Sequence, residues 1–109
     1  MRGRAMAWFY LVLAGLLEIV WATAMKQSEG FTRPGVTAVM VVAMVASFWL
    51  LALAMRTLPL GTSYTVWVGI GAVGAFIAGI VLFGDPVTPT RLLAAGLIVA
   101  GIVTMKLAS

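Results

Sequence analysis

Residues Leu58 to Phe83 read LPLGTSYTVWVGIGAVGAFIAGIVLF and include no charged residue. A helix that crosses a membrane needs roughly 20 mostly apolar residues, so this run is long enough by itself. Three other mostly apolar runs lie at about Ala5 to Met25, Gly35 to Met55 and Val87 to Leu107. The first is broken only by Glu18, and the last is the weakest, because its uncharged core extends only from Leu92 to Met105. The sequence therefore predicts four transmembrane helices in a single domain that covers residues 1–109.

The composition excludes most soluble classes of protein. Hydrophobic residues make up 63% of the chain and charged residues 9%, whereas soluble domains have about 45–50% and about 25%. The basic residues are scattered singly instead of forming a nucleic-acid-binding patch. Because Cys and His are absent, thiolate sites and the commonest metal ligand are excluded. We expect an all-α membrane protein that is not an enzyme and has no cofactor, no metal and no nucleic-acid partner.

The distribution of basic residues leaves the membrane orientation open. Four basic residues lie on the side of the two termini: Arg2, Arg4, Arg56 and Lys106. Three lie on the other side: Lys26, Arg33 and Arg91. The excess of cytoplasmic Lys and Arg decides orientation, and this difference is very small. Either the first two arginines fix the N-terminus inside, or the chain inserts both ways and pairs as an antiparallel dimer.

Small residues recur at four-residue spacing in the last two spans. They are Gly71, Ala75 and Gly79 in the third, and Gly96, Ala100 and Thr104 in the fourth, where Gly101 adds another. Such residues let membrane helices approach closely. For the third span, packing within one chain and between chains fit equally well. For the fourth, the pattern favours self-association through Gly96, Ala100 and Gly101.

Glu18 is the one charged residue near the middle of a predicted span. A carboxylate at this depth costs several kcal/mol unless it is neutral or paired. No Lys or Arg shares the apolar core of any span, so we expect the acid to hold either a proton or a cation. Trp21 lies on the same helix face, and an indole beside a carboxylate suits an organic cation. The structural alternative is a protonated Glu that is hydrogen-bonded inside a helix bundle.

Three more polar or aromatic positions lie within the spans. Ser47 interrupts the second, and Tyr64 and Trp67 share a face near the start of the third. Hydroxyl groups could orient a carboxylate. However, a membrane Ser often bonds its own helix, and Tyr and Trp often mark the membrane interface.

Taken together, these residues resemble the small multidrug resistance family. The resemblance lies in Leu17 to Ala22, Lys26 with Ser28 to Arg33, Ser47 to Leu51, and Leu58 to Tyr64 with Trp67 and Gly69 to Gly71. It extends from Met6 to the C-terminus. It implies an antiparallel, dual-topology homodimer in the bacterial inner membrane that exports cations in exchange for protons. Glu18 would match the family's essential acid, Tyr64 and Trp67 its substrate-stacking residues, and Gly69 and Gly71 its conformational hinge.

Trp21 is similar to the residue at this position in the guanidinium-exporting subtype. The resemblance therefore implies guanidinium or small guanidinyl cations as substrate, with Trp21, Ser47 and Tyr64 orienting Glu18. A planar guanidinium fits a carboxylate with two parallel hydrogen bonds and stacks on aromatic rings. Three alternatives remain: an exporter of quaternary ammonium and other lipophilic cations, one half of a heterodimeric transporter, and a passive channel or accessory subunit.

Overall fold

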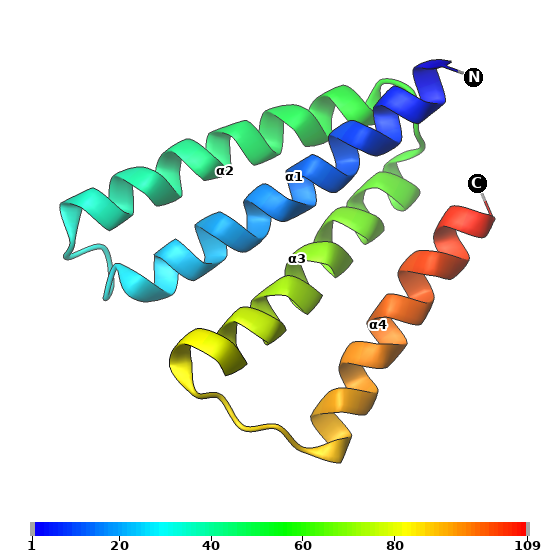
Figure 1. The fold of residues 1–109 in the computed structure, drawn as a ribbon. Helices are drawn as coiled ribbons and strands as arrows, with labels where there is room; N and C mark the ends of the chain where they lie inside the picture. The colour runs from blue at the N-terminus through cyan, green and yellow to red at the C-terminus, as the bar shows by residue number, and fades with distance from the viewer. Residues whose placement is uncertain (1, 109) are drawn as a thin grey trace.

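The structure, a computed structural model, describes residues 2–108, which form four helices joined by short connections (Figure 1). The helices are α1 (Arg2–Gln27), α2 (Pro34–Met55), α3 (Leu60–Phe83) and α4 (Pro89–Leu107). Each is long and apolar enough to cross a membrane. The prediction of an all-helical chain with four such helices is confirmed. The antiparallel dimer and the single domain stay predictions.

Local sequence explains where the helices begin and end. Pro34 occupies the first turn of α2, where its missing N–H costs nothing. At the end of α3, Gly84 adopts a left-handed conformation (φ 70°), as glycine often does after a helix, and the N–H of the following Asp85 donates to the carbonyl of Gly79 at 3.1 Å. At the start of α4, the Thr88 side chain accepts a 3.1 Å hydrogen bond from the N–H of Arg91. The connection between α1 and α2 and the one between α3 and α4 are therefore encoded locally.

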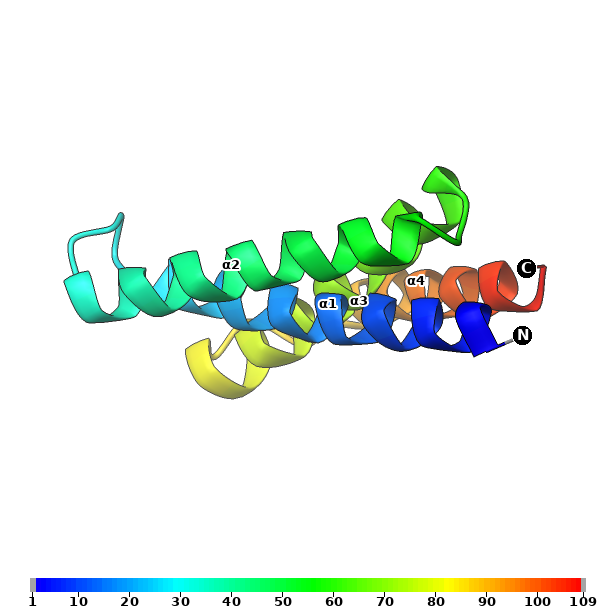
Figure 2. The same ribbon diagram turned by 90° about the horizontal axis from the view of Figure 1, so that it is seen from above.

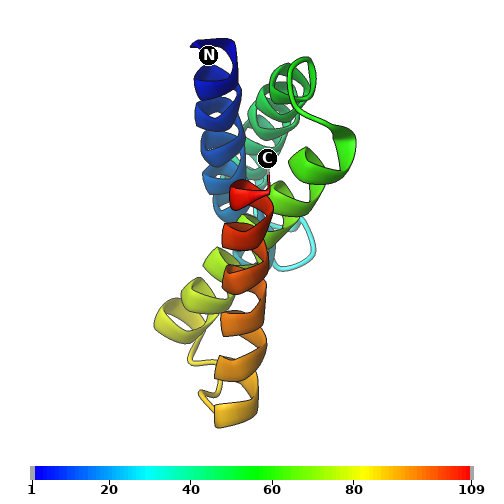
Figure 3. The same cartoon turned by 90° about the vertical axis from the view of Figure 1, so that its right-hand side faces the viewer.

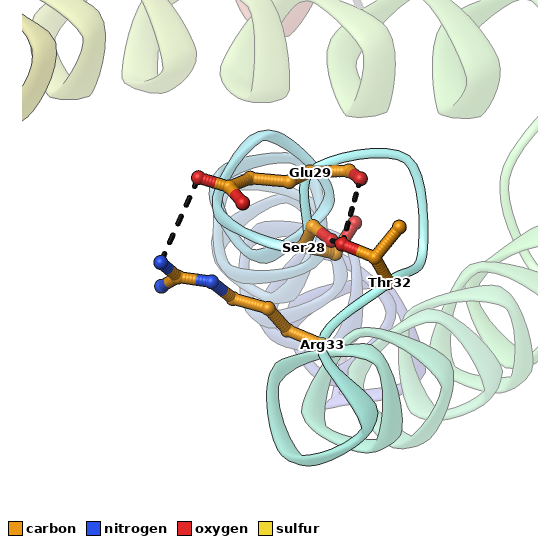
Figure 4. Close-up of polar contacts among 4 residues, drawn as sticks. All are labelled: Ser28, Glu29, Thr32 and Arg33. Atoms are coloured by element: carbon orange, nitrogen blue, oxygen red, sulfur yellow. Dashed lines mark hydrogen bonds and ion pairs between the residues drawn. The ribbon is translucent and has the colours of Figure 1, made fainter.

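The connection between α1 and α2 is a tight, internally bonded turn (Figure 4). The buried hydroxyl of Ser28 donates to the carbonyl of Met25 at 2.7 Å. The Thr32 hydroxyl lies 3.2 Å from the Ser28 carbonyl oxygen and 3.0 Å from that of Glu29. An exposed ion pair joins Arg33 to Glu29 at 3.6 Å. These short-range contacts turn the chain back on itself, so α2 runs alongside α1 in the opposite direction.

The folded chain is flat, with principal extents of 43 × 35 × 17 Å (Figure 2). α1 lies between α2 and α3, and both described chain ends lie at the same end of the helices (Figure 1). The buried core fills the space between α1, α2 and the start of α3. Its members are Ala7, Leu11, Ala14, Leu51, Ala54, Leu58, Val66 and Trp67.

α4 is the least enclosed element. It packs against α3 and lies in front of the other helices when the molecule is seen from the side (Figure 3). None of the residues Pro89–Leu107 is buried, and Leu93 and Leu97 are 63% and 64% exposed. Its 19 residues span about 28 Å at roughly 1.5 Å each, close to the roughly 30 Å thickness of the hydrocarbon core. α4 is therefore a full-length membrane helix that leaves most of its surface available to lipid or to another chain.

Basic side chains at the helix ends lie over aromatic rings. The Nζ of Lys106 is 4.6 Å from the ring centre of Trp8, which ties the end of α4 to the start of α1. The other two pairs are Arg91 over Phe76 at 5.5 Å and Lys26 over Phe83 at 6.0 Å. A cation over a ring face is attracted by the ring quadrupole. These three charges are thus accommodated at the helix ends, away from Glu18.

Candidate functional site

The candidate site lies where α1 and α3 come closest. Along this seam, each larger side chain of one helix fits against a glycine of the other. A Cβ added at Gly15 would come within 2.7 Å of Ile70, and one added at Gly74 would overlap Ile19. Between these two contacts, Glu18 of α1 lies directly against Gly71 of α3. The close approach of the two helices thus places a carboxyl group against the backbone of α3.

The Glu18 side chain is partly buried, and its Oε1 atom is fully buried. This oxygen has no hydrogen-bond partner among residues 2–108. An unpaired carboxylate in a membrane interior is costly unless it takes up a proton or a cation. Among the described residues, the charge of this acid is therefore compensated neither by a Lys or Arg nor by a hydrogen bond to Oε1.

Ser47 of α2 bonds to the turn of α1 that precedes Glu18. Its fully buried hydroxyl donates to the carbonyl of Ala14 at 2.7 Å and accepts a 3.0 Å hydrogen bond from the Trp67 Nε1. In an α-helix, the carbonyl of Ala14 also receives the N–H of Glu18. Ser47 and Trp67 thus link α1, α2 and α3 at the depth of the acid. The single Ser47 hydroxyl proton points to Ala14 here, so its expected bond to Glu18 stays a prediction.

Four aromatic side chains form a continuous row across the three helices. The ring centres are 6.2 Å apart for Trp21 and Phe48, 5.6 Å for Phe48 and Trp67, and 5.5 Å for Trp67 and Tyr64. The Trp67 side chain is almost fully buried, whereas Phe48 and Tyr64 are about half exposed. The row therefore has an inner part that packs against the core and an outer part that presents ring faces and edges.

Trp21 lies at the end of the row nearest to Glu18 in sequence. Its Nε1 is buried and has no hydrogen-bond acceptor within residues 2–108. A buried indole N–H usually finds a partner. Residues 2–108 thus leave a donor at Trp21 and an acceptor at Glu18 without partners, three residues apart on one helix face.

The structure separates the remaining predicted residues into three locations. Gly71 lies beside Glu18, whereas Gly69 faces Ile102 of α4. The residues expected to pack a dimer, Gly96, Ala100 and Gly101, lie on exposed α4. A Cβ added at Gly96 or Gly101 would meet no atom within 4 Å. The bending of α3 and the dimer contact of α4 stay predictions.

Phe48 is the residue of the row that we did not predict as part of the site. It follows Ser47 directly, which could have drawn attention to it. Its place between two indoles depends on how α2 crosses α1 and α3, and the sequence of one helix does not specify this crossing. The described residues include no group of three or more Asp, Glu, His or Cys side chains suited to a metal ion.

A cavity of about 230 Å³ opens one helical turn beyond the acid. It begins at Ala22 and Ala75, which follow Glu18 and Gly71 by four residues, and it is also lined by Thr23, Lys26, Ala78, Gly79, Phe83 and Asp85. Glu18 thus lies near an open groove between α1 and α3.

Comparison with known proteins agrees with this arrangement. The family model described as "Small Multidrug Resistance protein" matches residues 6–98. A protein named "Guanidinium exporter" from Yersinia pseudotuberculosis is 56% identical over 104 residues, which is 95% of this chain and 100% of the relative. Proteins of the same name from Citrobacter freundii and Salmonella typhimurium are 54% identical over 95% of this chain and 99% of each relative. With four helices able to cross a membrane, this multi-pass membrane protein belongs to the small multidrug resistance family.

Proposed function

We propose that the chain exports guanidinium across the bacterial cytoplasmic membrane in exchange for protons, working as an antiparallel homodimer. More than half of its residues are identical to those of relatives named guanidinium exporters. The observation that carries the proposal is the buried Glu18 carboxyl oxygen with no hydrogen-bond partner in residues 2–108. Exchange follows if protons and substrate compete for this acid, because it is costly to leave bare.

The surroundings of Glu18 suit a planar, permanently charged cation. Guanidinium donates parallel hydrogen bonds to a carboxylate and stacks on aromatic faces. The row from Trp21 to Tyr64 supplies such faces beside the acid. In the proposed dimer, the two copies of Glu18 bind either the substrate or protons. Trp21, Ser47 and Tyr64 orient the acids, and Trp67 lines the site.

Alternating access requires that the shared site open to one side of the membrane at a time. We infer that α3 bends near Gly69 and Gly71, where the absence of side chains leaves the backbone least restricted. The exposed face of α4 supports the dimer, because Gly96, Ala100 and Gly101 leave room for the backbone of a second helix. The nearly equal numbers of basic residues on the two sides support insertion in both orientations.

A second candidate is an exporter of quaternary ammonium and other lipophilic cations. The half-exposed rings of Phe48 and Tyr64 favour it, because apolar cations gain more from aromatic surface than from fixed hydrogen-bond donors. The relatives' names and the unused Trp21 donor favour guanidinium.

Transport by purified protein in proteoliposomes tests the proposal. An imposed proton gradient should drive guanidinium in the direction opposite to the flow of protons. Guanidinium should also be carried far better than tetraphenylphosphonium. Glu18→Gln keeps the size of the side chain and removes its titration, so the coupled flux should disappear. Near-normal exchange in this variant would refute the role of Glu18, and the reverse substrate ranking would favour the second candidate. Uncoupled, non-saturating flux would indicate a channel.

A further inference from the structure

The two glycines expected to form a hinge in α3 have different neighbours. A Cβ added at Gly69 would lie 2.8 Å from the outer atoms of the Ile102 side chain on α4. A Cβ added at Gly71 would instead overlap the Glu18 carboxyl group on α1. A flexible isoleucine tip yields more easily than a group enclosed between two helices. Gly71 therefore contacts the acid, which a role as a hinge alone does not require.

No directional bond fixes the buried oxygen of Glu18. The Cγ, Cδ and Oε1 atoms of Glu18 are the three atoms nearest to the position that a Gly71 Cβ would occupy. Because Oε1 has no hydrogen-bond partner within the described residues, its position depends on packing. The surface it packs against is the bare backbone of α3 at Gly71.

We propose that Gly71 is a positioning residue for Glu18: its missing side chain sets how deep the carboxyl group lies between α1 and α3. This inference rests on the proposed function, in which Glu18 holds the cation. A methyl group at position 71 would push the carboxyl out of the seam. α1 cannot easily move back, because Ser47 ties its Ala14 carbonyl to α2. The acid would then be displaced relative to its cation and to the aromatic row.

Displacement of the acid should alter both cation binding and proton binding. Few charged groups lie on the helices that pack against Glu18. The position of its own carboxyl group should therefore have the largest effect on how it binds a proton or a cation. α2 and α3 carry no charged residue, and the titratable group of α3 is Tyr64, about two turns before Gly71. On α1, Lys26 lies two turns beyond Glu18 and is placed over Phe83.

The test compares Gly71→Ala with Gly74→Ala. A Cβ at position 74 also overlaps a side chain of α1, but that side chain is the aliphatic Ile19. Binding of guanidinium to purified protein is measured at several pH values for both variants. We expect Gly71→Ala to weaken binding by about tenfold to a hundredfold, which corresponds to about 1.4–2.8 kcal/mol, and to shift the pH midpoint of binding. Gly74→Ala should keep the native affinity and midpoint.

Two outcomes would overturn the inference. If Gly71 serves only as a bend, Gly71→Ala will slow transport while the affinity and the pH midpoint of binding stay native. If Gly71→Ala and Gly74→Ala lose binding equally, crowding between α1 and α3 explains the effect without the acid.

A compensating variant keeps the test decisive when Gly71→Ala folds poorly. Glu18→Asp shortens the acid by one methylene and should relieve the overlap, so Gly71→Ala/Glu18→Asp should recover folding or binding relative to Gly71→Ala alone. Failure of the double variant to recover either would refute the inference. The native protein is measured first with guanidinium and with tetraphenylphosphonium. Failure of guanidinium to compete with protons there contradicts the proposed function, while the glycine comparison can still be made with whichever cation binds.

Discussion

Replacement of Ser47 by Ala tests how the acid-bearing helix is held. The Ser47 hydroxyl is fully buried and makes two hydrogen bonds, to the Ala14 carbonyl at 2.7 Å and from the Trp67 indole at 3.0 Å. Ser47→Ala removes both bonds and leaves the indole N–H without its acceptor. The Ala14 carbonyl keeps its helical partner, so most of the cost falls on Trp67.

The expected loss can be derived from these contacts. A net hydrogen bond contributes about 0.5–1.5 kcal/mol, and interhelical bonds in membranes average about 0.6 kcal/mol. A buried donor that loses its partner costs about 1–3 kcal/mol. We therefore expect Ser47→Ala to lower the free energy of unfolding by about 2 kcal/mol, which is roughly a 30-fold change in the equilibrium constant.

Ser63→Ala is the matched control. Ser63 is also fully buried, but its hydroxyl oxygen has no hydrogen-bond partner among the described residues. Reversible unfolding of detergent-solubilised protein with increasing dodecyl sulfate gives both free energies. Ser63→Ala should be neutral or slightly stabilising, because it removes a buried polar group without a partner. Equal losses in the two variants would refute the reasoning.

A double-mutant cycle separates the two bonds of Ser47. Trp67→Phe keeps an aromatic ring and removes the indole donor. In that background, Ser47→Ala should cost about 1 kcal/mol less than in the native protein, because no N–H is left unpaired. An undiminished cost would mean that the bond between Ser47 and Trp67 contributes nothing to stability.

Two further substitutions examine the aromatic row and the exposed helix. Phe48→Leu removes the ring that contacts Trp21 and Trp67 and should weaken guanidinium binding up to about tenfold. Trp49→Leu changes the exposed neighbouring residue and should leave guanidinium binding unchanged. An equal loss of binding in the two variants would indicate that the site lies elsewhere. A Cβ added at Gly101 would meet no atom within 4 Å, so Gly101→Leu should fold but lower the cross-linked dimer fraction. Gly61 on α3 has equally open surroundings, so Gly61→Leu should leave the dimer fraction unchanged. An unchanged dimer fraction in Gly101→Leu would refute packing through α4.

The four helices were predictable because the bilayer leaves few options. A backbone without water must bond internally, and the apolar runs are long enough to cross as helices. The breaks were equally clear, since Pro34, Gly84 and Pro89 lie at or beside the ends of the helices. These features depend on neighbours within a few residues, which a single sequence contains in full.

The partners of the site residues were less predictable, because they depend on how the helices cross. The sequence suggested Ser47 as a hydroxyl that orients Glu18, yet its proton goes to the Ala14 carbonyl of a different helix. It also left open whether the small residues of the third span pack within or between chains. The structure places Gly71 and Gly74 against α1 of the same chain. The sequence identifies which residues are small or polar, whereas the crossing of the helices determines what each one meets.

The difference between α3 and α4 extends this argument to the dimer. Side chains of α1 occupy the space beside Gly71 and Gly74, whereas the space beside Gly96 and Gly101 is open. An exposed glycine in a membrane helix gains nothing from packing against lipid tails, and it destabilises a helix relative to Ala. On α4, Gly96 and Gly101 leave room for a second helix to approach closely, which supports the proposed dimer. In the proposed dimer, each copy supplies one Glu18 to a shared site, and the Oε1 atom that has no hydrogen-bond partner among residues 2–108 gains one from the dimer or the cation.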